Sequence, residues 1–219
     1  MSQLNVRLLI VCGQGTYANK TFHSEFPEKA CYLRHAKTVK QIVATHKYTH
    51  IVVSGGFTKA STPNVSEARS FAAIWDEYGV WPFSTQNERK KNIFYDEVAL
   101  DSSENMLSGL MEARKCIDKH NTNDDGCILR RIVEVGVFVC WAFKRKRFAM
   151  MANQLGLLCN EAKFTFHGCN KLELCSSPKH AIAGESTVVS TSELDGCLLF
   201  GKEYEKKRFQ RFCNKFQKN

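Results

Sequence analysis

The sequence lacks any apolar run near the roughly 18 residues that a helix needs to cross a bilayer. The apolar stretch closest to the start, Leu8–Cys12, is too short for the core of a secretion signal, and no small-residue cleavage site follows it. We therefore expect a cytoplasmic protein that neither spans a membrane nor is anchored in one.

Paired cysteines are also missing, although the chain contains ten cysteines. No two of them form a C-x-x-C pair, and the seven histidines show no ligand spacing with them. Structural metal sites depend on such clusters. We therefore expect reduced thiols that pack as small apolar side chains, and no metal site.

The chain is short of acids: 22 Asp and Glu stand against 31 Lys and Arg, which gives a net charge of +9. The segment Lys202–Asn219 carries seven cations and two acids, and its apolar spacing predicts a basic helix over 202–217. Such a tail can contact nucleic acid or an acidic partner, but more often it is a solvated face.

Apolar periodicity predicts strands and helices in alternation. Strands are expected at 6–12, 49–53, 93–95, 131–140 and 163–166. Helices are expected at 29–46, 67–78, from 101 or 102 to 119, and from the end of the fourth strand through Leu158. Loops or linkers are expected at 16–28, 81–92 and 121–126. This order predicts one α/β domain over 1–219, a Rossmann-like three-layer sandwich with a mostly parallel central sheet.

Glycines, hydroxyls and charges follow each of the first four predicted strands. Because ligands of parallel sheets bind outside the carboxyl ends of the strands, these segments predict one shared site. Its candidate ligand-binding residues are Gly13, Gly15, Ser54, Gly55, Gly56, Ser66, Glu67, Asp96, Ser102, Glu104, Asn105, Lys144, Arg145 and Arg147. The candidates for a catalytic acid or base are Glu67, Asp96 and Glu104.

Each of these segments also has a structural interpretation. Gly13 and Gly15 suit a tight turn as well as they suit a bound ligand. Glu67 can be a dipole partner in the first turn of a helix. Asp101 and Glu104 have the spacing of a capping box, which we favour slightly over a cluster of ligand-binding carboxylates.

The four cations Lys144–Arg147 follow the fourth predicted strand, where a helix is expected to begin. Positive charge there opposes the helix dipole, so either the helix begins later or the cations face an anion. Beside three other polar loops at the same sheet edge, we interpret them as the charged wall of an anion site.

The order and spacing of these motifs resemble the YdcF-like family, whose bacterial members include SanA- and ElyC-like proteins. The resemblance is carried by Val53-Ser54-Gly55-Gly56, by Ser66-Glu67-Ala68, and by Asp96 followed by Ser102-Ser103-Glu104-Asn105. Asp96 stands where the family often has Glu, and Ser102 where it has Thr. The hydroxyls and His of the bacterial fourth motif are absent, and Phe143–Phe148 looks like the form in fungal and protist members.

The resemblance implies a Rossmann-like domain and a polar site, without a settled activity. We expect binding of a small anionic ligand of nucleotide type or bearing phosphate, with hydrolysis or group transfer as the natural reaction for an enzyme. S-adenosylmethionine, suggested for bacterial members, is an alternative cofactor. Ser54 stands where an acid would hold its ribose, and the cations favour phosphate over a sulfonium. A non-catalytic scaffold with a basic tail that contacts nucleic acid or an acidic partner is a further alternative.

Overall fold

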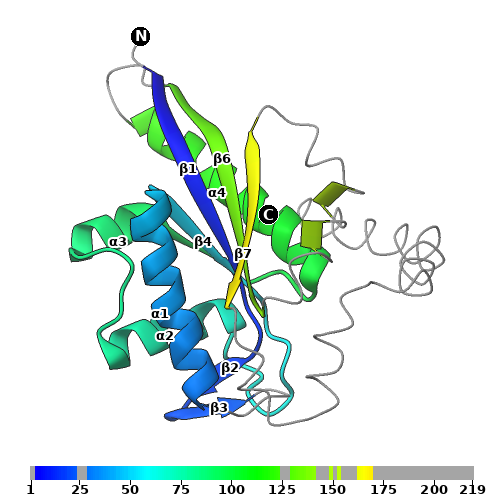
Figure 1. Cartoon of the computed structure of the whole chain (residues 1–219). Coiled ribbons are helices and arrows are strands. Elements are labelled where there is room, and N and C mark those ends of the chain that lie inside the picture. Colours follow the sequence, from blue (N-terminus) through cyan, green and yellow to red (C-terminus); the bar gives the residue numbers. More distant parts are fainter. Residues whose placement is uncertain are drawn as a thin grey trace, which may run out of the picture. The chain divides into compact units, whose positions relative to one another are not determined.

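The computed structural model describes residues 3–23, 29–123, 129–141, 148–149, 152–153 and 162–169 (Figure 1). The chain divides into two units, Met1–Ser176 and Ser177–Asn219, and every described residue belongs to the first. The predicted basic helix at 202–217 lies outside the described residues. That helix and the expectation of a single domain over 1–219 stay predictions.

Strands and helices alternate along the first unit. The strands are β1 (Gln3–Cys12), β2 (Thr16–Ala18), β3 (Thr21–His23), β4 (His50–Ser54), β5 (Ile93–Asp96), β6 (Leu129–Trp141) and β7 (Lys163–Cys169). The helices are α1 (Lys29–His46), α2 (Glu67–Tyr78), α3 (Gln86–Asn92) and α4 (Ser102–Asn123). No helix among these is long and apolar enough to cross a membrane.

The main sheet has five strands in the order β5-β4-β1-β6-β7, and every neighbouring pair is parallel. The sheet separates two apolar clusters. One joins alternate strand residues to α1 and α2, and the other joins the intervening strand residues to α4 and to Phe148 and Ala152. Figure 1 shows α1 and α4 on opposite sides of the sheet. The predicted α/β sandwich with a parallel central sheet is therefore confirmed.

The order of the strands reverses once. The chain builds β4 and then β5 on one side of β1, and it then places β6 and β7 on the other side. In open parallel sheets the crevice for a ligand lies where the strand order reverses, because the loops on the two sides diverge there. That point lies here between the carboxyl ends of β1 and β6.

Two expected connections have structure of their own. Residues 16–28 were expected to be loop, but β2 and β3 pair antiparallel across Asn19 and Lys20, both with positive φ. No Asn-Gly or Asp-Gly pair marks this turn, so the hairpin has no strong local signal. Likewise, 81–92 was expected to be a linker, but it contains α3, which begins with a capping box between Thr85 and Glu88.

The expected loop at 121–126 is also wrong in part, because α4 continues to Asn123.

Candidate functional site

The carboxyl ends of β1, β4 and β5 lie level with one another, because Cys12 pairs with Ser54 and Ser54 pairs with Asp96. Hydrogen bonds join the loops after these strands. The Gly13 N–H donates to Ser54 O at 2.7 Å, and the Gly55 N–H donates to Asp96 O at 2.9 Å. The structure therefore brings three of the predicted polar segments together at one edge of the sheet.

A side-chain contact crosses the point where the strand order reverses. Gln14, between the two glycines that follow β1, donates from Nε2 to the Val139 carbonyl of β6 at 3.3 Å. The Gly13–Gly15 turn therefore faces the end of β6, and two residues of that strand follow Val139 before it ends at Trp141. The predicted cations Lys144, Arg145 and Arg147 follow Trp141 in sequence but lie outside the described residues.

Protein atoms occupy the space in front of three predicted glycines. A Cβ added to Gly13 would lie 2.6 Å from Glu67 Cβ and 2.7 Å from Glu67 Oε2. A Cβ at Gly55 would lie 2.8 Å from Glu67 Cβ, and one at Gly56 would lie 2.7 Å from Ala99 O. These glycines allow Glu67 and the loop after β5 to approach the backbone, so their packing alone explains why no side chain stands there. Gly15, between β1 and β2, is buried.

Glu67 is buried where the glycine turns meet. It is the first residue of α2, and Ser66 caps the helix by accepting the Arg69 N–H at 3.1 Å. The N–H groups of Glu67 and Ala68 donate to the carbonyls of Gly56 and Gly55. The first three amides of α2 are thus already hydrogen-bonded, which leaves this helix start with little capacity to hold a phosphate.

The Glu67 carboxylate points back over these turns. Its Oε1 accepts the hydroxyl of Thr58, and its Oε2 faces Gly13 and Gly55. Glu67 therefore combines burial with a fixed position at the sheet edge, beside the turn after β1.

Asp96, at the end of β5, belongs to a buried hydrogen-bond network. Its Oδ2 accepts the hydroxyls of Ser54, at 2.5 Å, and of Ser108, and its Oδ1 accepts the Val98 N–H at 3.0 Å. The Ser54 hydroxyl also lies 3.2 Å from Asn105 Oδ1. Because a hydroxyl has one proton, the shorter contact to Asp96 is the donation. Asp96 and Ser54 therefore join β4, β5 and α4 rather than face a ligand.

Glu104 caps α4. The Glu104 N–H donates to Asp101 Oδ1 at 3.1 Å, and its own carboxylate accepts the Leu100 N–H at 2.7 Å. This reciprocal pattern is close to the capping box that the spacing suggested, with the acceptance moved back by one residue. Ser102 is the first residue of α4.

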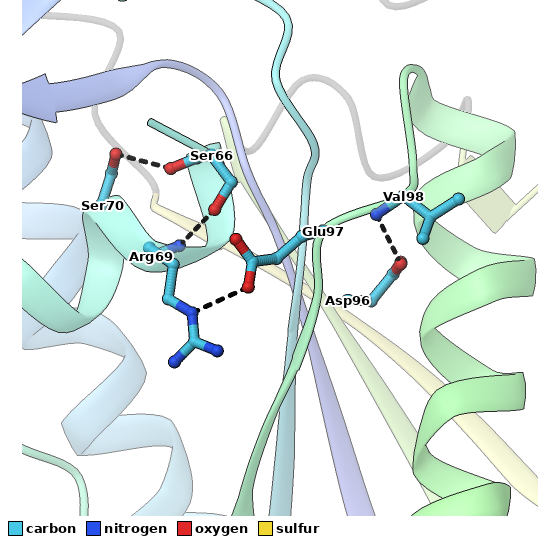
Figure 2. Close-up of polar contacts among 6 residues, drawn as sticks. All are labelled: Ser66, Arg69, Ser70, Asp96, Glu97 and Val98. Atoms are coloured by element: carbon cyan, nitrogen blue, oxygen red, sulfur yellow. Dashed lines mark hydrogen bonds and ion pairs between the residues drawn. The ribbon is translucent and has the colours of Figure 1, made fainter. Parts of the chain in front are cut away.

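The loop after β5 is tied to the start of α2, as Figure 2 shows. Arg69 Nε lies 2.8 Å from Glu97 Oε1, and the Arg69 guanidinium lies over the Tyr95 ring at 4.1 Å from its centre. Burial raises the pKa of Tyr95, and the Arg69 charge opposes that rise. An exposed ion pair of this kind contributes little to stability.

Sequence reasoning missed Thr58 and Ser108. Each hydroxyl binds a carboxylate, at Glu67 and Asp96 respectively. Ser108 lies four residues after Glu104 on α4, so helical spacing could have placed it on the same face. Thr58 has no comparable signal, because a loop has no period. Among the described residues, no group of three His, Cys, Asp or Glu side chains could hold a metal ion.

Comparisons with protein-family models, with curated proteins and with solved structures find no match to this chain. The resemblance to the YdcF-like family therefore stays a prediction. The arrangement of the chain's own residues is the basis on which a function can be proposed.

Proposed function

We propose that this protein binds a small anionic ligand, of nucleotide type or bearing phosphate, at the carboxyl edge of its parallel sheet. The observation that carries the proposal is the reversal of strand order between β1 and β6, with a glycine turn on one side of it. This is the position at which open parallel sheets bind their ligands. Gln14, which bridges the turn to Val139, lies at the centre of the proposed site.

The two sides of this edge favour different parts of such a ligand. On the side of β4, Glu67 is a buried carboxylate that can accept hydroxyl groups, such as those of a ribose. A phosphate beside it would be repelled. On the side of β6, the chain continues from Trp141 into Lys144, Arg145 and Arg147, and we assign the phosphate to these cations.

Of the three acids considered as catalytic, we assign ligand contact to Glu67, because its carboxylate lies against the turn after β1. Asp96 joins β4, β5 and α4 through its hydrogen bonds, and Glu104 caps α4. If a proton is transferred during hydrolysis or group transfer, Glu67 is the base that we assign to it. S-adenosylmethionine is less favoured, because an acid at the end of β4 would be expected to hold its ribose. Ser54 stands at that position instead.

Isothermal titration calorimetry against ATP, ADP, S-adenosylmethionine and inorganic phosphate tests the proposal. We expect binding of a phosphate-bearing compound with a dissociation constant in roughly the micromolar range, weakened at least about tenfold by Glu67→Gln or by Arg147→Ala, since one tenfold step is about 1.4 kcal/mol. Glu112→Gln on α4 is the matched control, because it removes an acid away from the strand ends. Absence of binding by every compound at millimolar concentration would refute the proposal.

A further inference from the structure

We propose that Phe57 stacks on the base of the bound ligand, so that the site selects nucleotides over sugar phosphates and inorganic phosphate. This inference rests on the proposed function and names the class of its ligand. Its observations are the exposure of Phe57 and the hydrogen bonds on either side of it.

Phe57 is an aromatic side chain left in solvent beside the site. Four large apolar side chains among the described residues are exposed, and Phe57, at 48%, is the aromatic one. Full burial of a Phe side chain contributes about 1.5–3 kcal/mol, and leaving it half exposed forgoes roughly half of that. An exposed aromatic next to a proposed ligand site is therefore a candidate for a contact that forms on binding.

The residues on either side of Phe57 are fixed to the site. The Gly56 N–H donates to Ala99 O at 2.6 Å, and its carbonyl accepts the Glu67 N–H at 3.0 Å. On the other side, the Thr58 hydroxyl binds the Glu67 carboxylate. Phe57 therefore lies one residue from each of two anchors, so its backbone is held beside Glu67.

The rest of this loop is held as well. Thr62 is buried, and its hydroxyl lies 2.5 Å from that of Thr16, in the strand after the Gly13–Gly15 turn. The Thr62 N–H donates to Lys59 O at 3.1 Å. The segment from Gly55 to Ser66 is thus attached to the sheet edge at several points, which lowers the entropy lost when a ligand contacts it.

The place of Phe57 in the chain fits the chemistry of a nucleotide. We assign the ribose hydroxyls to Glu67, whose carboxylate accepts the Thr58 hydroxyl. Phe57 precedes Thr58 directly, so the Cα atoms of these two residues are about 3.8 Å apart. In a nucleotide the base is attached directly to the ribose. Leu100, also exposed, follows the Ala99 that accepts the Gly56 N–H, so a second apolar side chain marks the same side of the site.

The test is calorimetric titration of the full chain with AMP and ATP, and with ribose 5-phosphate and pyrophosphate as probes without a base. Stacking on an aromatic side chain is worth about 1–3 kcal/mol per base, which is a change of about 5- to 150-fold in affinity. We expect Phe57→Ala to weaken the binding of AMP and ATP by a factor in this range. The affinity for ribose 5-phosphate and pyrophosphate should not change. Phe57→Tyr should keep the affinity, and Phe57→Leu should lose it, because Leu is apolar but has no ring.

Met111→Ala on α4 is the matched control, since Met111 is also exposed. Circular dichroism should show the fold intact in every variant. Equal affinity of the wild-type chain for AMP and ribose 5-phosphate, with no effect of Phe57→Ala, would overturn this inference while leaving the proposed function standing. Absence of binding by all four compounds would overturn both.

Discussion

Replacement of Gly13 by Ala tests the packing on which the proposed site depends. The added methyl would lie 2.6 Å from Glu67 Cβ, 2.7 Å from Glu67 Oε2 and 3.2 Å from Ser54 O. Carbon atoms in contact prefer about 3.5–4.0 Å, so the contact with Glu67 Cβ is too close by about 1 Å. The carboxylate could rotate away, but Cβ is fixed to the backbone of α2.

Relief of this overlap requires the first turn of α2 or the turn after β1 to move. Overpacking of this kind costs typically about 1–3 kcal/mol, and we expect Gly13→Ala to lie at the upper end because a main-chain element must shift. For a domain of this size, 1 kcal/mol corresponds to about 2–4 °C in Tm, so a cost of about 3 kcal/mol lowers Tm by about 6–12 °C.

Urea unfolding followed by circular dichroism measures the loss. Gly79→Ala is the control, because Gly79 has φ of +62° and no atom within 4 Å of an added Cβ. Its cost of about 1–2 kcal/mol is therefore purely conformational. Glu67→Gly has a cost of its own, but it should lower the free energy of unfolding less when added to Gly13→Ala than when added to Gly79→Ala, because it relieves the overlap only in the first. A free energy of unfolding for Gly13→Ala within about 0.5 kcal/mol of the wild type, which is the range of ordinary surface substitutions, would refute the reasoning.

The remaining predictions concern the buried network and the helix caps. Asp96→Ala removes the charged acceptor of two hydroxyls and one amide. The Ser54 and Ser108 hydroxyls keep Asn105 Oδ1 and the Glu104 carbonyl as second acceptors, but since one hydrogen bond to a charged group contributes about 1.5–3 kcal/mol, we expect a loss of about 3 kcal/mol in urea unfolding. A loss below about 1 kcal/mol, the size of one ordinary hydrogen bond, would show that Asp96 does not join β5 to α4 as described. The backbone N–H and then the hydroxyl of Thr85 lower the pKa of Glu88, so the stabilisation from Glu88 is present above its ordinary pKa and is lost as pH falls through the lowered value. Thr85→Ala should raise that pKa partway toward its ordinary value in a carboxyl NMR titration, and an unchanged titration would contradict the capping box.

Local patterns predicted much of the fold. The apolar spacing at 29–46 and 67–78 indicated helices whose bounds agree with α1 and α2. The alternation of strands and helices predicted the parallel sheet, because parallel strands need crossover connections. This alternation did not predict the order of the strands in the sheet. That order places the reversal between β1 and β6.

Contacts between distant residues could not be predicted. Glu67 has the sequence context of a dipole partner, and it is one, but nothing near it in sequence indicates that it packs against Gly13 and Gly55. Asp96 and Glu104 looked alike as polar residues after one strand. In the structure, Asp96 accepts hydroxyls from β4 and α4, whereas Glu104 caps its own helix. These differences arise from tertiary packing, which overrides local preference.

The central claim is that the ligand lies where the strand order reverses, and NMR titration of the full chain with ATP tests it most directly. We predict saturable shifts of the backbone amides of Gly13, Gly15, Phe57 and Glu67, with none for Gln3, His50 and Leu129 at the starts of β1, β4 and β6. Unchanged amides throughout, or saturable shifts confined to the starts of these strands, would contradict the account.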